Sequence, residues 1–133
     1  MIQSAGKLIY NPRSHLGSND KWLVLMCDDE ISKYYRHLYT MKYSFLNGER
    51  TGKLTRPIWG AHISIIRGEK LPSPGLWRLD EGKIVNFEYE PGVIDNKIYY
   101  WLKVKCHYLN DLRERYSLPR EPRFGLHLTI GRK

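Results

Sequence analysis

The same short motif, centred on a histidine, occurs at two places in the chain. Residues 61 to 67 read Ala-His-Ile-Ser-Ile-Ile-Arg, and residues 126 to 132 read Leu-His-Leu-Thr-Ile-Gly-Arg. Imidazole titrates near neutral pH without a large environmental shift, so two histidines can divide the roles of base and acid in one reaction. We therefore interpret His62 and His127 as a catalytic pair.

A hydroxyl follows each histidine two residues later, at Ser64 and at Thr129. Alternate residues of a β-strand share a face, so each motif predicts a strand with its histidine and hydroxyl on one side and apolar residues on the other. Two hydroxyls between two imidazoles could donate hydrogen bonds to the non-bridging oxygens of one phosphate. Such a site suits phosphodiester cleavage, and we expect it to need neither a metal nor another cofactor.

Four further residues are candidates for substrate binding. Arg67 and Arg132 each stand five residues after a histidine, which places them on the opposite face of a regular strand unless a bulge intervenes. Trp59 and Tyr10 are candidates for stacking on a base, because nucleotide sites commonly use aromatic side chains. Core packing is the commoner role of such residues, and it stays the alternative for both.

Composition sets bounds on the class of protein. The 133 residues, of which 41% are hydrophobic and 27% charged, predict one globular domain spanning residues 1–133. No apolar run approaches about 18 residues and the N-terminus lacks the pattern of a signal peptide, so we expect a soluble, cytoplasmic, monomeric protein without a membrane partner. Cys27 and Cys106 lie in apolar segments and are interpreted as reduced core thiols. The net charge of +8 favours an anionic partner such as a nucleotide or RNA.

Hydrophobic periodicity predicts two similar halves, each with a strand, a helix and a histidine strand. Besides the two motifs, the predicted elements are strands at 7–10, 22–27, 84–90 and 98–106, and helices at about 31–45 and from about 107 to Pro119. The run at 22–27 is continuously apolar, which is typical of a central strand. Equivalent positions in two halves could bring both histidine faces together across a pseudo-twofold axis.

These motifs resemble those of the 2H phosphoesterases, a superfamily named for two His-apolar-Ser/Thr-apolar motifs that includes the LigT-type RNA cyclic phosphodiesterases. The resemblance covers roughly residues 22 to 132. It departs from the family's pattern at Leu126, where proline is common, and at Ser64, where threonine is commoner. The resemblance implies a bilobal, pseudo-twofold α+β fold, in which antiparallel sheets line a central cleft and the helices lie outside.

The resemblance also implies a phosphodiester hydrolase that works without a metal. The substrates it implies are 2′,3′-cyclic phosphates, 2′-5′ linkages, RNA 3′ ends and cyclic oligonucleotides, and the resemblance does not choose among them. By the same resemblance, His62 should act at the ribose 2′ oxygen and His127 at the opposite apical position.

Alternatives remain open within and beyond this class. A stand-alone basic enzyme would suit RNA-end processing, and it would equally suit a phage-type, anti-defence enzyme that degrades cyclic oligonucleotide signals. A non-catalytic RNA-binding module on the same fold is the alternative of another class. Intact histidines and hydroxyls in both motifs favour the enzyme over this module.

Overall fold

The computed structural model describes residues 1–12, 21–47, 54–57, 59–72, 75 and 77–133. Along these residues the elements follow in the order β1 (Ile2–Tyr10), β2 (Lys21–Cys27), α1 (Asp29–Asn47), β3 (His62–Glu69), β4 (Ile84–Asp95), β5 (Tyr99–Lys105), α2 (His107–Arg115) and β6 (His127–Arg132). Within the described residues, no helix is long and apolar enough to cross a membrane.

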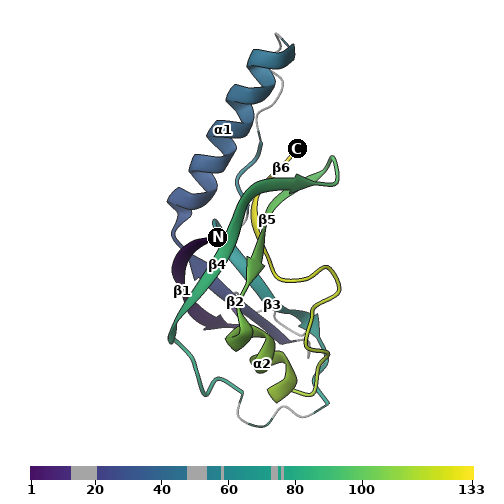
Figure 1. Ribbon diagram of the computed structural model, residues 1–133. Helices are drawn as coiled ribbons and strands as arrows, with labels where there is room; N and C mark the ends of the chain where they lie inside the picture. The colour runs from purple at the N-terminus through teal and green to yellow at the C-terminus, as the bar shows by residue number, and fades with distance from the viewer. Residues whose placement is uncertain (13–20, 48–53, 58, 73–74, 76) are drawn as a thin grey trace.

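The strands form a closed antiparallel barrel in the order β1-β2-β3-β6-β5-β4 (Figure 1). The expected bilobal α+β fold, with two sheets lining a cleft, is therefore wrong. Closure depends on β1, which pairs with β4 from Ile2 to Lys7 and with β2 from Gly6 to Tyr10. The sequence indicated only the last part of this strand, because residues 2–6 mix polar and small side chains without an apolar alternation.

The two halves of the chain occupy equivalent parts of this barrel. Exchanging β1 with β4, β2 with β5 and β3 with β6 leaves the order of neighbouring strands unchanged. In each half, two paired strands are followed by a helix and then by a strand that begins with a histidine. The two histidine strands, β3 and β6, are direct neighbours, so the halves meet along the motif residues.

The barrel interior and one side of each helix form the core. The α2 helix lies at the opposite end of the barrel from α1 (Figure 1). The apolar stripe on one side of α2 is buried, whereas the apolar stripe of α1 buries Tyr35 but leaves three residues exposed. The C-terminal part of α1 extends beyond the strands (Figure 1). The buried residues of the α2 stripe are Leu109, Leu112 and Tyr116, and the exposed residues of the α1 stripe are Tyr34, Leu38 and Met41.

Local signals set the limits of several elements. Asp28 accepts a hydrogen bond from the Glu30 N–H at 3.0 Å through its Oδ1 atom, which caps the start of α1. The strands β4 and β5 form an antiparallel pair, and β4 extends beyond the predicted strand at 84–90 because Pro91 and Gly92 lie inside it at a shift of register. Both cysteines are free thiols, and burial raises the pKa of Cys27 to about 12.

Candidate active site

Pairing between β3 and β6 brings the two histidine motifs together. The paired residues are His62 with Thr129 and Ile63 with Leu128. Continuing this register by one step places Ser64 opposite His127. Residues directly opposite in an antiparallel pair lie on one face of the sheet, so each histidine has the hydroxyl of the other motif across from it. The side chains of both histidines and both hydroxyl residues are half-buried on the outward face, and the apolar residues between them are buried in the core.

A bulge in each histidine strand changes which residues face outward. Neighbouring residues of β2 pair with Ser64 and Ile66, which leaves Ile65 as an extra residue in β3. The β6 strand has the same irregularity at Ile130. Because an extra residue shifts the alternation by one, the odd offset of the arginines no longer turns them away from the histidines. Arg67 and Arg132 therefore lie on the same face of their strands as the histidines, which we call the histidine face, and both are exposed.

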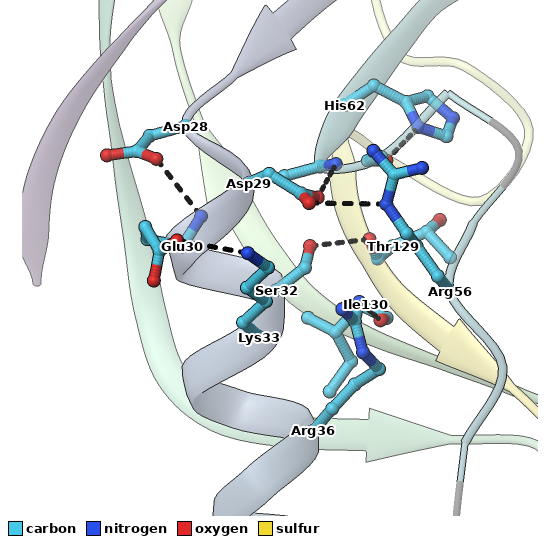
Figure 2. A network of polar contacts seen from close by, with 12 residues as sticks. Asp28, Asp29, Glu30, Ser32, Lys33, Arg36, Arg56, His62, Thr129 and Ile130 are labelled. Atoms are coloured by element: carbon cyan, nitrogen blue, oxygen red, sulfur yellow. Dashed lines mark hydrogen bonds and ion pairs between the residues drawn. The ribbon is translucent and has the colours of Figure 1, made fainter.

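Arginines from the helices bind the carbonyl groups of the two bulge residues. Arg113 of α2 donates to the Ile65 carbonyl at 2.7 Å, and Arg36 of α1 donates to the Ile130 carbonyl at 2.7 Å (Figure 2 shows the second contact). Each helix therefore supports the histidine strand of the other half. Arg113 is only 3% exposed and also forms an ion pair with Glu69 at 2.8 Å. Sequence reasoning missed Arg36, although both arginines stand three residues before a tyrosine.

Both imidazole rings are held in the same way. His62 Nδ1 lies 2.8 Å from the Gly60 carbonyl oxygen, and His127 Nδ1 lies 3.0 Å from that of Gly125. A carbonyl only accepts hydrogen bonds, so Nδ1–H donates and the neutral ring carries its lone pair at Nε2. The two glycines have φ values of 69° and 70°, which other residues rarely adopt. Sequence reasoning missed this glycine two residues before each histidine, a signal present in both motifs.

A carboxylate anchors the turn that precedes His62. Asp29, the first residue of α1, accepts hydrogen bonds from the Ala61 N–H at 3.0 Å and from Arg56 Nε at 3.2 Å (Figure 2). A Cβ atom at Gly60 would lie 2.9 Å from Asp29 Oδ1, so close packing as well as φ favours glycine at this position. Asp29 is therefore a positioning residue for His62.

The turn that precedes His127 is held by main-chain hydrogen bonds instead. The Gly125 N–H donates to the Pro122 carbonyl at 2.9 Å, and the Leu126 carbonyl accepts from the Val104 N–H at 3.0 Å. A Cβ atom at Gly125 would meet its nearest neighbour only at 4.0 Å. The two turns thus have the same shape but different surroundings.

Burial lowers the pKa of both histidines. For His62 burial is the largest cause, the hydrogen bond with Gly60 opposes it, and the charges of His127 and Arg67 lower the pKa further. For His127 burial again dominates, the hydrogen bond with Gly125 opposes it, and Arg67 lowers the pKa. These shifts favour the neutral rings at neutral pH, in which Nε2 can accept a proton. The positive charge of Arg67 thus lowers the pKa of both rings.

A tryptophan lies beside each histidine. The ring centroids of Trp59 and His62 are 5.2 Å apart, and those of Trp101 and His127 are 6.0 Å apart. Trp101 lies directly opposite Thr129 in the pairing of β5 with β6. It was not among the candidate site residues, although the alternation over residues 98–106 placed it on the face away from the core.

Of the two remaining candidates, Tyr10 lies in the core, whereas Arg132 lies on the same face as the histidines. Tyr10 is 1% exposed, its hydroxyl lies 3.3 Å from that of Tyr116, and its ring packs edge-on against Trp77 at 4.8 Å. Its interpretation as a base-stacking residue is therefore wrong, because the residue type alone does not show which face of a strand it occupies. Arg132 lies at the end of β6, where its main chain pairs with that of Thr55.

The outward face of β3 and β6 thus carries two imidazoles, two hydroxyls and one nearby guanidinium. Among the described residues, no group of three or more histidine, cysteine, aspartate or glutamate side chains is arranged to hold a metal ion. Comparisons with family models, with curated proteins and with solved structures found no match for this chain. What the protein does is therefore inferred from the chemistry of this face.

Proposed function

We propose that this protein is a phosphodiesterase that cleaves a nucleotide or RNA phosphodiester by acid-base catalysis with His62 and His127. The observation that supports this most directly is the register of β3 and β6, which pairs His62 with Thr129 and, extended by one residue, sets Ser64 across from His127. Directly paired residues have Cβ atoms about 5 Å apart, so one phosphate could contact polar groups from both strands.

Hydrolysis of a 2′,3′-cyclic phosphate illustrates the division of roles. His127 Nε2 accepts a proton from water as the water oxygen attacks phosphorus. The bond between phosphorus and O2′ breaks, and protonated His62 donates its proton to O2′, so the phosphate stays on O3′. The two rings have then exchanged protonation states. When a 2′-hydroxyl is the attacking group, the roles of the two histidines reverse.

The remaining groups of this face stabilise negative charge. The hydroxyls of Ser64 and Thr129 donate hydrogen bonds to the non-bridging oxygens, and the Arg67 guanidinium supplies a positive charge. The bulge at Ile65 supports this role because it puts Arg67 on the same face as the histidines, and the charge of Arg67 lowers the pKa of both rings. Each well-placed acid or base contributes roughly 100- to 10,000-fold in rate. No step is assigned to a metal ion or another cofactor.

A substrate panel in EDTA tests the proposal. The panel contains 2′,3′-cyclic nucleotides, 2′-5′ oligoadenylate, cyclic di- and trinucleotides, and short RNA. We expect turnover of at least one class, which is lost in His62→Ala and His127→Ala and kept in His37→Ala, whose imidazole is exposed on α1. Activity that EDTA abolishes and that zinc or manganese restores would contradict the mechanism.

The same panel separates the alternatives. Turnover confined to cyclic oligonucleotides would favour an enzyme that degrades cyclic oligonucleotide signals, and turnover of cyclic RNA ends would favour RNA processing. RNA binding without turnover of any substrate would favour a non-catalytic RNA-binding module. Kinship with the 2H phosphoesterases is proposed at the level of the motifs only, because the closed barrel differs from the fold that the resemblance implies.

A further inference from the structure

The outward face of β5 carries aromatic and basic side chains. Burial alternates along the whole strand, and Tyr100, Leu102 and Val104 belong to the core. The side chains at the other positions lie on the opposite face. We call this set the β5 stripe, and its residues are Tyr99, Trp101, Lys103 and Lys105.

The β5 stripe runs directly beside the candidate active site. Its pairs with β6 are Lys103 with His127, Trp101 with Thr129, and Tyr99 with Arg132. Paired residues share a face, so the stripe and the histidine face form one continuous surface. A ligand that extends beyond a single phosphate would therefore contact the stripe.

The groups of the β5 stripe are accessible to a ligand. Lys103 and Lys105 are exposed. Neither lysine forms an ion pair with any residue that the structure describes. Tyr99 is 44% exposed. Aromatic rings on which bases stack, combined with positive charges along the backbone, are the means by which proteins bind single-stranded nucleic acid.

We propose that the β5 stripe binds single-stranded RNA and leads it to the two histidines. This inference rests on the proposed function and narrows the substrate class from nucleotides in general to an oligonucleotide strand. Tyr99 and Trp101 would stack on unpaired bases, and the two lysines would contact phosphates beyond the scissile bond. A duplex suits this surface poorly, because its bases are already stacked on one another.

Binding is measured by fluorescence anisotropy with a labelled 2′-O-methyl RNA of about ten nucleotides, whose blocked 2′ oxygens cannot attack. We expect Tyr99→Ala and Lys105→Glu each to raise Kd by about fivefold to tenfold, and Lys105→Glu also to make Kd less dependent on salt. The matched control is Lys42→Glu, the same charge reversal at an exposed position of α1, which should leave Kd within about twofold. Equal effects of the two charge reversals, or no effect of either stripe variant, would overturn the proposal.

Turnover separates failure of this inference from failure of the proposed function. A mononucleotide and an oligoribonucleotide that end in the same 2′,3′-cyclic phosphate are compared. The ratio of their kcat/KM values should favour the oligonucleotide and should fall about fivefold to tenfold in Tyr99→Ala. A ratio near one that does not change in Tyr99→Ala would overturn the proposal that the stripe binds RNA. It would not affect the proposal that the protein is a phosphodiesterase. Stripe-dependent binding without turnover of these two substrates or of any other member of the substrate panel would support RNA binding by the stripe and contradict the phosphodiesterase.

Discussion

The two histidine motifs are alike on their outward face and different in what supports them. His62 and His127 lie in strands with the same order of burial, the same bulge and the same glycine turn. Behind this face, the Asp29 carboxylate binds the turn before His62, whereas main-chain hydrogen bonds hold the turn before His127. The side chains that would act on one phosphate are thus equivalent in the two motifs, whereas the groups that position those side chains differ.

The helices show the same combination of likeness and difference. The Tyr39 hydroxyl of α1 bonds that of Tyr100 at 3.1 Å, and the Tyr116 hydroxyl, at the end of α2, lies 3.3 Å from that of Tyr10. Both helices therefore contact the other half of the chain. They differ in their arginines, because Arg113 is almost fully buried with an acidic partner and Arg36 is more exposed.

The largest expected effect tests whether the two histidines are equivalent. His62→Ala and His127→Ala should each lower turnover by about 1,000-fold or more, and the double variant should be little worse, because both groups serve one transition state. A substrate whose 5′ leaving group needs little protonation should rescue His127→Ala far more than His62→Ala. Single-turnover kinetics measure both effects. Equal rescue would show that the assignment of roles is wrong even if the site is right.

The next effect concerns the helix arginines. Arg113→Met should lower the free energy of unfolding by about 3 kcal/mol, because it leaves the Ile65 carbonyl and the Glu69 carboxylate without their buried partner. Arg36→Met should cost about 1 kcal/mol, since water can reach that position more easily. Urea denaturation measures both values. Similar costs would mean that burial does not distinguish the two supports.

A smaller effect tests Asp29 as a positioning residue. Asp29→Ala should lower turnover about tenfold and perturb the imidazole resonances of His62 but not those of His127, because its hydrogen bond holds only the first turn. Asp28→Ala is the matched control: it removes the cap of the same helix at a cost of about 1 kcal/mol without touching that turn.

Nitrogen-15 NMR reports the tautomer of each ring in these variants. Asp29→Asn keeps an acceptor oxygen and should recover most of the turnover. Loss of activity in both alanine variants, with both histidines perturbed, would instead indicate a general effect of α1.

The smallest expected effects are on titration. Arg67→Gln should raise the pKa of both histidines, whereas His127→Ala should raise that of His62, because each change removes a positive charge that lowers those values. The acid limb of the kcat/KM profile should then move to higher pH in Arg67→Gln. NMR titration provides the pKa values, and a shift of only one histidine in Arg67→Gln would contradict the placement of this charge.

Stability should follow the same shifts. Both histidines bind protons less readily in the folded chain than in the unfolded one, so the protein should lose stability as pH falls through about 6.5. Arg67→Gln should reduce this loss, which urea denaturation at several pH values would measure. A protein as stable at pH 5 as at pH 7 would argue against buried, neutral rings.

Local patterns predicted the features that depend on neighbouring residues. Alternation identified the two histidine strands and the pair β4 and β5, and helical spacing located both helices. The closed barrel could not be predicted in this way, because it depends on pairing between β1 and β4, and the residues of β1 that pair there carry no apolar pattern. The expectation of a bilobal fold came from the resemblance to the 2H phosphoesterases. That resemblance rests on the two motifs, which do not determine how the sheet closes.

The candidate site was predictable to a similar degree. Spacing placed His62 and Ser64 on one face, and likewise His127 and Thr129, but it could not show that the two strands are neighbours in this register. The bulges depend on pairing with other strands, so Arg67 could be placed only conditionally. Asp29 and Arg36 act across long separations in sequence, which periodicity does not report.

The pairing of β3 with β6 also determines when the site can form during folding. The strand pairs β1 with β2 and β4 with β5 join neighbouring segments, whereas β1 with β4 and β3 with β6 join segments far apart in the chain. Contacts between distant segments form slowly, because the chain between them must be ordered first. A refolding chain should therefore regain its local strand pairs and helices before it regains the proposed activity. Recovery of turnover would time the closing of the barrel, and circular dichroism would time the earlier steps.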